Sequence, residues 1–271
     1  MGEQLATPQG APPREHRHGD PLMSNPAAAL GQEVGKLFEL SIVERLHPQV
    51  ESRGYEIGPQ RMVNGTDNVY QIDAVISDAD GQPVMILDPK YIRYKKHNRD
   101  KGSWLCVAHY NLRKTYPTIR KTTAVLAGNW SKTSLALIES FGIEVIVQEF
   151  SNMVDILHSY KIEFDWAEKD RMTPTKALHA FNALSGDGKA DLAHALTDVV
   201  MPRLTASVVA VLEDTDKSVQ SRVSKVEVLV KTDRHEMLLL QFDSIAKTVS
   251  GLVDFMDESA DVSELLKKRQ I

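Results

Sequence analysis

Residues 68–92 read NVYQIDAVISDADGQPVMILDPKYI, in which two runs rich in β-branched and aliphatic residues flank the turn sequence DADG. An Asp/Gly turn between two such runs predicts a β-hairpin. Successive side chains of a strand point to opposite faces, so Asp88 and Lys90 are expected on one face of the second strand. Asp73 lies five residues before the turn and Asp88 seven residues after it, and this register predicts that both carboxylates share that face.

The polar face of this hairpin predicts a metal site. Two carboxylates and a lysine among apolar residues cost free energy unless a ligand compensates for their burial. Mg²⁺ prefers oxygen ligands and is commonly held by one or two carboxylates together with a substrate phosphate. Pro89 cannot donate to a sheet ladder, so it favours a sheet edge, a bulge or a splayed pair of strands. A splayed hairpin would open a site, and the Pro89 carbonyl oxygen is then a further candidate ligand. The alternative is a hairpin whose Asp and Lys side chains simply face solvent.

The flanking segments predict an α/β fold with a mixed central sheet flanked by helices. Apolar residues at helical spacing indicate a helix from about Pro26 to His47 that ends before Pro48. A strand is expected over residues 55–63, interrupted at Gly58-Pro59. After the hairpin, helices and strands alternate, which favours parallel strands joined by crossovers. The helices are expected at residues 102–115 and 132–141, and the strands at 122–126 and 143–147.

The spacing of the acidic residues resembles a known motif. Asp73, a spacer of fourteen residues, and then Asp88-Pro89-Lys90 are similar to the signature of the PD-(D/E)XK nucleases, which share the restriction-endonuclease-like fold. The order of elements predicted for residues 28–147 is also similar to the core of that family, and it covers a little under half of the chain. The resemblance implies a restriction-endonuclease-like core over residues 28–151.

The leading helix adds to this resemblance. Gly35-Lys36-Leu37-Phe38-Glu39, followed downstream by Gly54-Tyr55-Glu56-Ile57, looks like the start of Mrr-like and archaeal Holliday-junction-resolvase-like members. In those relatives a helix glutamate completes the metal site, so Glu39 is the candidate here and Glu33 the second choice. The Gln-x-x-x-Tyr motif of the RecB-like branch is missing from residues 102–115, and that branch is not assigned.

The chemistry that the resemblance implies is hydrolysis of a DNA phosphodiester bond by an activated water. Asp73, Asp88, the Pro89 carbonyl and Glu39 would hold Mg²⁺, or Mn²⁺ in its place, and Lys90 would orient or deprotonate the water. The expected function is a deoxyribonuclease, more specifically an endonuclease in restriction, phage defence or repair. The alternative is a catalytically inactive nuclease-fold module that binds nucleic acid or a protein partner.

A basic segment follows the predicted site. The chain carries a net charge of −5, but ten Lys or Arg residues between Lys90 and Lys121 face the single acid Asp100, so this segment carries +9 and the remainder −14. A phosphate backbone that approaches the metal would meet these charges, although they could also serve only solubility. The candidate nucleic-acid ligands are Arg93, Lys95, Lys96, Arg99, Lys101, His109, Arg113 and Lys114.

Two features of this segment leave alternatives open. His109 and Arg113 are four residues apart on one helical face, which either points to the scissile phosphate or is solvated. Five aromatic residues could stack on unpaired bases or pack against the sheet, and packing is favoured for Trp104. They are Tyr91, Tyr94, Trp104, Tyr110 and Tyr116.

The two ends of the chain differ from its centre. Residues 1–27 are rich in Pro, Gly, Ala and His and predict a flexible tail. Residues 152–271 are expected to form a mostly helical appendage. From Val219 onward apolar residues recur at a spacing of four and three, which resembles a coiled-coil seam. This region is expected to form a homodimer or to dock a partner, and packing onto the nuclease domain is the alternative.

The cysteine content and hydropathy favour a cytoplasmic protein. The single cysteine, Cys106, excludes an intramolecular disulfide framework and a multi-cysteine zinc site. It lies in an apolar run, which favours a buried side chain over a catalytic nucleophile. No run of eighteen apolar residues occurs, so no membrane-spanning segment is expected.

Overall fold

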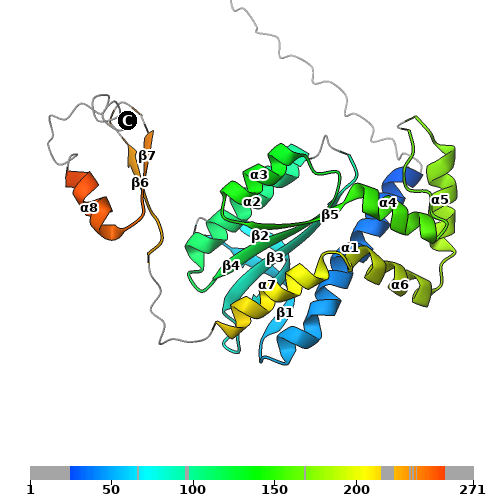
Figure 1. Cartoon of the computed structure of the whole chain (residues 1–271), viewed down its shortest axis with the longest axis horizontal. Coiled ribbons are helices and arrows are strands. Elements are labelled where there is room, and N and C mark those ends of the chain that lie inside the picture. The colour runs from blue at the N-terminus through cyan, green and yellow to red at the C-terminus, as the bar shows by residue number, and fades with distance from the viewer. Residues whose placement is uncertain are drawn as a thin grey trace, which may run out of the picture. The chain divides into compact units, whose positions relative to one another are not determined.

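The computed structural model describes residues 25–65, 67–94, 98–167, 169–214, 223–231, 233, 235 and 237–253. These residues belong to two compact units, one on each side of the boundary between residues 214 and 215. The first unit contains a sheet with helices on both faces, and the second contains a two-stranded hairpin and one helix (Figure 1). Most of the tail expected over residues 1–27 lies outside the described residues.

The first unit is built on a five-stranded sheet in the order β1-β2-β3-β4-β5. Strands β1 to β3 form an antiparallel meander, and β4 and β5 extend it in parallel, so the sheet is mixed as predicted. Their bounds are β1 Glu56–Val63, β2 Val69–Ser77, β3 Pro83–Ile92, β4 Lys121–Gly128 and β5 Glu144–Glu149.

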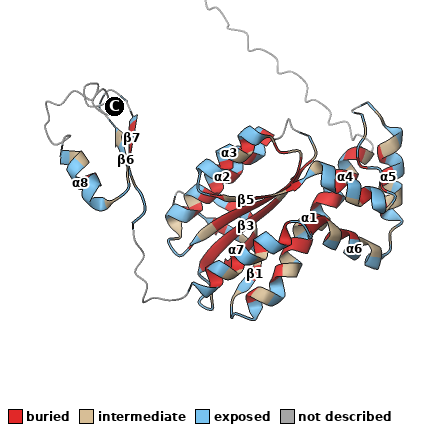
Figure 2. Ribbon diagram, viewed as in Figure 1, coloured by how far each residue is buried: buried red, intermediate tan, exposed pale blue. Residues whose placement is uncertain are grey.

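Helices cover both faces of this sheet. The helices α2 (Asn98–Thr115) and α3 (Lys132–Ser140) make the two parallel crossovers and pack on one face. Helix α1 (Pro26–Glu51) packs on the other face, where its apolar side chains share one core with β3 and β4. Figure 2 shows the strands as a buried layer between partly exposed helices. The α/β class and the predicted order of elements up to β5 are therefore confirmed.

Prolines lie inside both α1 and β1 without ending either element. Helix α1 does not end before Pro48 but continues to Glu51, because the buried Val50 anchors the last turn and offsets the hydrogen bond that proline cannot donate. The interruption expected at Gly58-Pro59 is a β-bulge within a single strand, since the β1–β2 register shifts between Gly58 and Gln60.

The helices after β5 belong to the same unit as the sheet. They are α4 (Phe150–Ser159), α5 (Met172–Asn182), α6 (Gly186–Thr197) and α7 (Met201–Glu213). Their buried residues, such as Phe181 and Leu204, form one hydrophobic cluster with Phe38 of α1 and Leu87 of β3. The compact unit therefore extends to Asp214, beyond the end of the core that the sequence predicted at residue 151.

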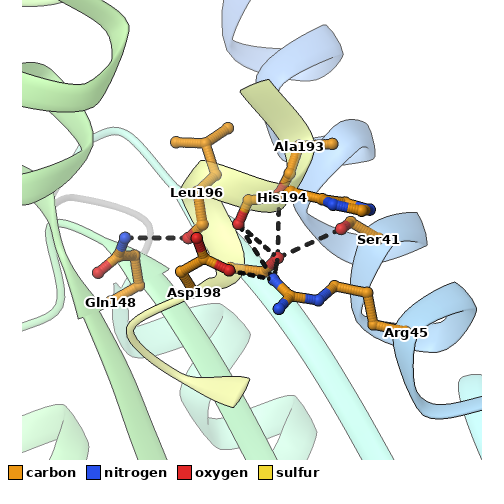
Figure 3. A network of polar contacts seen from close by, with 8 residues as sticks. Ser41, Arg45, Gln148, Ala193, His194, Leu196 and Asp198 are labelled. Atoms are coloured by element: carbon orange, nitrogen blue, oxygen red, sulfur yellow. Dashed lines mark hydrogen bonds and ion pairs between the residues drawn. The ribbon is translucent and has the colours of Figure 1, made fainter. Parts of the chain in front are cut away.

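A polar network fixes α6 to α1 and to the sheet (Figure 3). Arg45 of α1 donates hydrogen bonds to the His194 carbonyl at 3.1 Å and to Asp198 at 2.7 Å, which places a cation at the C-terminal end of α6. Ser41 lies 3.2 Å from the Thr197 hydroxyl. Gln148 of β5 donates to the Leu196 carbonyl at 2.9 Å. Both α1 and β5 thus hold the end of α6.

The second unit corrects the prediction for the C-terminal region. Residues Val226–Lys231 and Met237–Phe242 form the antiparallel strands β6 and β7, followed by α8 (Ile245–Val253). The coiled-coil seam is therefore wrong, because the valines at 226, 228 and 230 alternate with exposed residues at the period of a strand. Val219 and Met256, which the seam included, lie outside the described residues. Dimerisation through this region stays a prediction.

No single helix within the described ranges is long and apolar enough to cross a membrane. Among the same residues, the bent pair of α6 and α7, with an angle of 73° between the two helices, is long and apolar enough when both are taken together.

Gly128 and Gly81 provide a matched test of the packing at the end of β4. Both have positive φ angles, +98° and +73°, but a Cβ atom at Gly128 would lie 2.0 Å from the Ile92 carbonyl oxygen, whereas one at Gly81 would meet nothing within 4 Å. We expect Gly81→Ala to lower the free energy of unfolding by about 1 kcal/mol and Gly128→Ala by more than ~3 kcal/mol. Urea denaturation compares them, and equal losses would show that the contact with Ile92 is unimportant.

Glu144 predicts a pH-dependent contribution to stability. Burial alone would raise the pKa of its carboxyl, but hydrogen bonds from Ser207 and Lys121 outweigh burial and hold the pKa below the ordinary 4.5. This contribution is present above the unfolded pKa and is lost as pH falls through the lower native pKa. We expect Glu144→Gln to cost about 1 kcal/mol at pH 7 and progressively less below pH 4.5. A difference that persists undiminished in acid would contradict this.

Candidate active site

The candidate site lies where β2 and β3 separate. The two strands pair from Ser77 and Pro83 only as far as Ala74 and Leu87. Beyond that pair β2 continues beside β1, and β3 continues beside β4. Pro89, which cannot donate to a ladder, lies two residues past the last β2–β3 pair, as the prediction of a splayed hairpin requires.

The register of β2 and β3 brings Asp73 to Asp88. Both residues are next in register after the pair of Ala74 with Leu87. Val75 and Ile86, two positions from them, pack on the α2 side of the sheet, so Asp73 and Asp88 are expected on that side, and Lys90 lies there too because Ile92 does. A bulge in β2, where two residues face the single Pro59 of β1, lies at the same point. The convergence that the hairpin register predicts is therefore present.

Lys90 bridges the two aspartates. Its ammonium contacts Asp73 Oδ2 and lies 2.8 Å from Asp88 Oδ1. The Asp88 side chain is only 6% exposed, whereas those of Lys90 and Asp73 are 27% and 33% exposed. The arrangement thus has a buried carboxylate at its base and a carboxylate and an ammonium at its solvent-facing side.

His109 has a position that the sequence did not indicate. It was expected to face either a phosphate or solvent, but it is fully buried, with Nε2 3.4 Å from Asp88 Oδ2. The reason is that His109 lies on the buried face of α2 with Leu105 and Leu112. Arg113, one turn later, is exposed and donates to the Gly142 carbonyl. The prediction that His109 and Arg113 share one face of the helix is therefore wrong. His109 instead contacts Asp88 from the buried side of the site.

Glu39 approaches the same charges from α1. Burial and the neighbouring charge of Asp73 raise the pKa of the Glu39 carboxyl, while Lys90 and a backbone hydrogen bond with Tyr91 lower it in part. Gly35, one turn earlier, permits this approach, because a Cβ atom there would lie 3.0 Å from the Tyr91 ring. Glu33 is exposed on α1. The structure therefore brings Glu39, and not Glu33, close to the aspartates.

The electrostatics of the cluster are unbalanced. Burial raises the pKa of Asp73, although Lys90 opposes it. For Asp88, burial acts in the same direction but is outweighed by the hydrogen bond with His109 and the charge of Lys90, so its pKa is lowered. Burial likewise opposes the charge of Lys90, but Asp88 and Asp73 outweigh it and raise the pKa of Lys90. Lys90 thus favours the ionised forms of Asp73 and Glu39, and His109 and Lys90 together favour that of Asp88.

The donor set fits a hard divalent cation. Within the part of the chain that the structure describes, no three Asp, Glu, His or Cys side chains are grouped as they stand to hold a metal ion, and Lys90 lies between Asp73 and Asp88. Burial is the largest cause of the raised pKa values of Asp73 and Glu39, and repulsion between neighbouring carboxylates adds to it. Oxygen donors in such surroundings suit Mg²⁺.

The predicted nucleic-acid ligands divide into engaged and exposed residues. The Arg93 guanidinium donates to the Phe164 carbonyl at 2.7 Å and lies 3.6 Å from the centre of the Trp166 ring, so it holds two segments of the protein together. Lys101 donates to the Tyr91 carbonyl at 3.2 Å. Arg99 and Lys114 are exposed. Lys95 and Lys96 lie outside the described residues.

The aromatic residues also differ from expectation. Trp104, for which packing was favoured, is 60% exposed, with its ring centre 5.6 Å from that of Tyr70. Tyr91 is buried against α1. Cys106 is buried as predicted, and burial raises the pKa of its thiol, which does not suit a nucleophile. Trp104 is thus available to contact a ligand.

Comparisons with known proteins add little. No protein-family model and no curated protein matches this chain. One solved structure, the crystal structure of a protein of unknown function, AF1548, matches with a TM-score of 0.30 and 9% identity over 61% of this chain and 99% of that one. A likeness this weak carries no argument, so the site has to be judged from its own residues.

The bridge between Lys90 and Asp88 predicts strong energetic coupling. Lys90→Met would leave the buried Asp88 carboxylate without its ammonium partner, and we expect it to lower the free energy of unfolding by about 3 kcal/mol in metal-free buffer. In the double variant with Asp88→Asn the loss should be at least ~1 kcal/mol smaller than the sum of the single losses. Arg113→Met, at an exposed position, serves as the control, and strictly additive losses would refute the bridge.

Proposed function

We propose that this chain is a Mg²⁺-dependent nuclease that hydrolyses phosphodiester bonds of DNA, with Asp73, Asp88, Lys90 and Glu39 as its active site. The observation that carries the proposal is the meeting of Asp73, Asp88 and Lys90 at the point where β2 and β3 separate. The similar spacing of these residues in PD-(D/E)XK nucleases supports it. An endonuclease in restriction, phage defence or repair is the role that we favour.

Each residue of the cluster has a part that follows from its position. A bound Mg²⁺, or Mn²⁺ in its place, would polarise the phosphate and lower the pKa of a water. Asp73, Asp88, the Pro89 carbonyl and Glu39 would hold it. Buried Asp88 is fixed on one side by Lys90 and on the other by His109, so its oxygens have little freedom to move. His109 is then a positioning residue, because it acts through Asp88.

Lys90 is better suited to bind the phosphate than to accept a proton. Its ammonium contacts two carboxylates, and both contacts favour the charged form. A fixed cation beside the reacting phosphate would balance the negative charge that develops during hydrolysis. This supports the orienting role of Lys90 over the deprotonation that the resemblance also allows.

The location of the remaining basic residues supports a nucleic-acid substrate. Lys101 at the start of α2 lies close enough to Lys90 for the Lys90 charge to lower its pKa, although burial is the larger cause. Arg99 precedes it on the same helix. A DNA backbone that reached Asp73 would therefore pass an exposed basic edge.

Plasmid nicking tests the proposed function directly. We expect the intact chain with Mg²⁺ to convert supercoiled DNA to nicked or linear DNA. Asp88→Asn should lower the rate by more than ~100-fold, because losing a direct metal ligand should cost at least as much activity as losing a residue that only orients such a ligand. Asp80→Asn, the same change at an exposed turn position, should leave the rate unchanged. Equal rates for wild type and Asp88→Asn would favour the non-catalytic nuclease-fold module instead.

A further inference from the structure

A cleft of about 520 Å³ opens beside Glu39. One wall is the first part of α1, where Ala28 is exposed and the Tyr91 ring packs on Gly31 and Gly35. The opposite wall is the end of β3 and the residues that follow it, with Tyr91 at one end and the exposed Tyr94 at the other. Because Glu39 lines both the cleft and the candidate active site, a chain that occupies one can continue into the other.

The cleft combines apolar walls with positive charge. Lys36, Arg93 and Lys101 line it, and Glu39 is the one acid among its lining residues. It also reaches Ala27 and Ala28 in the N-terminal turn of α1, where the helix dipole favours an anion. A ligand that matches these walls has a flat apolar part and a negative charge.

The size of the cleft selects the form of nucleic acid. A volume of 520 Å³ falls within the range of roughly 300–1,000 Å³ that is typical of pockets for one small molecule. A base pair within a duplex cannot enter such a pocket, whereas a single unstacked nucleotide can. Tyr94 offers a ring on which a base could stack.

We propose that this cleft binds an unpaired nucleotide of the strand that is cleaved, next to the scissile phosphate. The base lies between Ala28 and Tyr94, and a phosphate lies near Lys36. The chain is therefore selective for DNA with a single-stranded segment beside the cleavage site. This inference rests on the proposed nuclease function and adds its substrate class.

Binding measured without cleavage tests the cleft separately from the nuclease activity. Fluorescence anisotropy of the full chain in metal-free buffer compares a labelled twelve-nucleotide single strand with the corresponding duplex. Ala28→Trp fills the cleft from an exposed position, and Leu40→Trp introduces the same tryptophan at an exposed position of α1 outside it. We expect Ala28→Trp to weaken single-strand binding at least ~10-fold and duplex binding less than ~2-fold, and Leu40→Trp to change neither.

A second variant covers the case in which Ala28→Trp does not fold. Tyr94→Ala removes the ring on which the base would stack, and we expect it to weaken single-strand binding at least ~5-fold at an unchanged melting temperature. Three results would each overturn the proposed role of the cleft. They are unchanged single-strand binding in the folded variants, an equal loss of affinity for single strand and duplex, and no single-strand binding by the wild type. If any of these results is found while Asp88→Asn still abolishes plasmid nicking, the proposed nuclease function stands and only the single-stranded substrate class is rejected.

Discussion

The separation of β2 from β3 after Ala74 and Leu87 is the constraint on which the candidate site depends. Asp73 and Asp88 are next in register after this pair, so their side chains share one face of the sheet. The bulge of β2 opposite Pro59 lies at the same point, and Pro89, which cannot donate to a ladder, comes two residues after the last β2–β3 pair. Asp73 and Asp88 therefore meet at an open end of the sheet, where Lys90 joins them.

The chemistry of this end follows from unequal exposure. Asp88 is buried and has two cationic or potentially cationic neighbours, while Asp73 is partly exposed and Glu39 reaches the cluster from a separate helix. The carboxylates thus become more exposed towards solvent, which is the side from which the proposed cation and phosphate would arrive. Gly35 contributes indirectly, because α1 can approach Tyr91 only where no side chain intervenes.

Much of the fold could be predicted because its determinants are local. Three local signals indicated the elements of the mixed sheet in their order along the chain. They are the Asp/Gly turn, the helical spacing of apolar residues in α1, and the alternation of helices and strands after the hairpin. The convergence of Asp73 with Asp88 also followed from counting residues on either side of the turn.

What could not be predicted depends on contacts between distant segments. His109 is four residues from Arg113, yet only the packing of α2 shows that one faces Asp88 and the other faces solvent. Arg93 was grouped with DNA ligands because it is basic, but Phe164 and Trp166, some seventy positions later, engage it. In the C-terminal unit, valines at 226 and 230 suit a helix as well as a strand when spacing alone is considered.

The anchoring of α6 on α1 affects how the chain can be shortened. Arg45 and Ser41 lie on the same helix as Glu39, and both contact residues 194–198. Proteolysis or truncation after β5 would expose the apolar side of α1 that α5 to α7 cover and would free the helix that carries the glutamate. A fragment that ends near residue 151 would therefore tend to aggregate, and a soluble minimal version of this unit has to retain the sequence through Asp214.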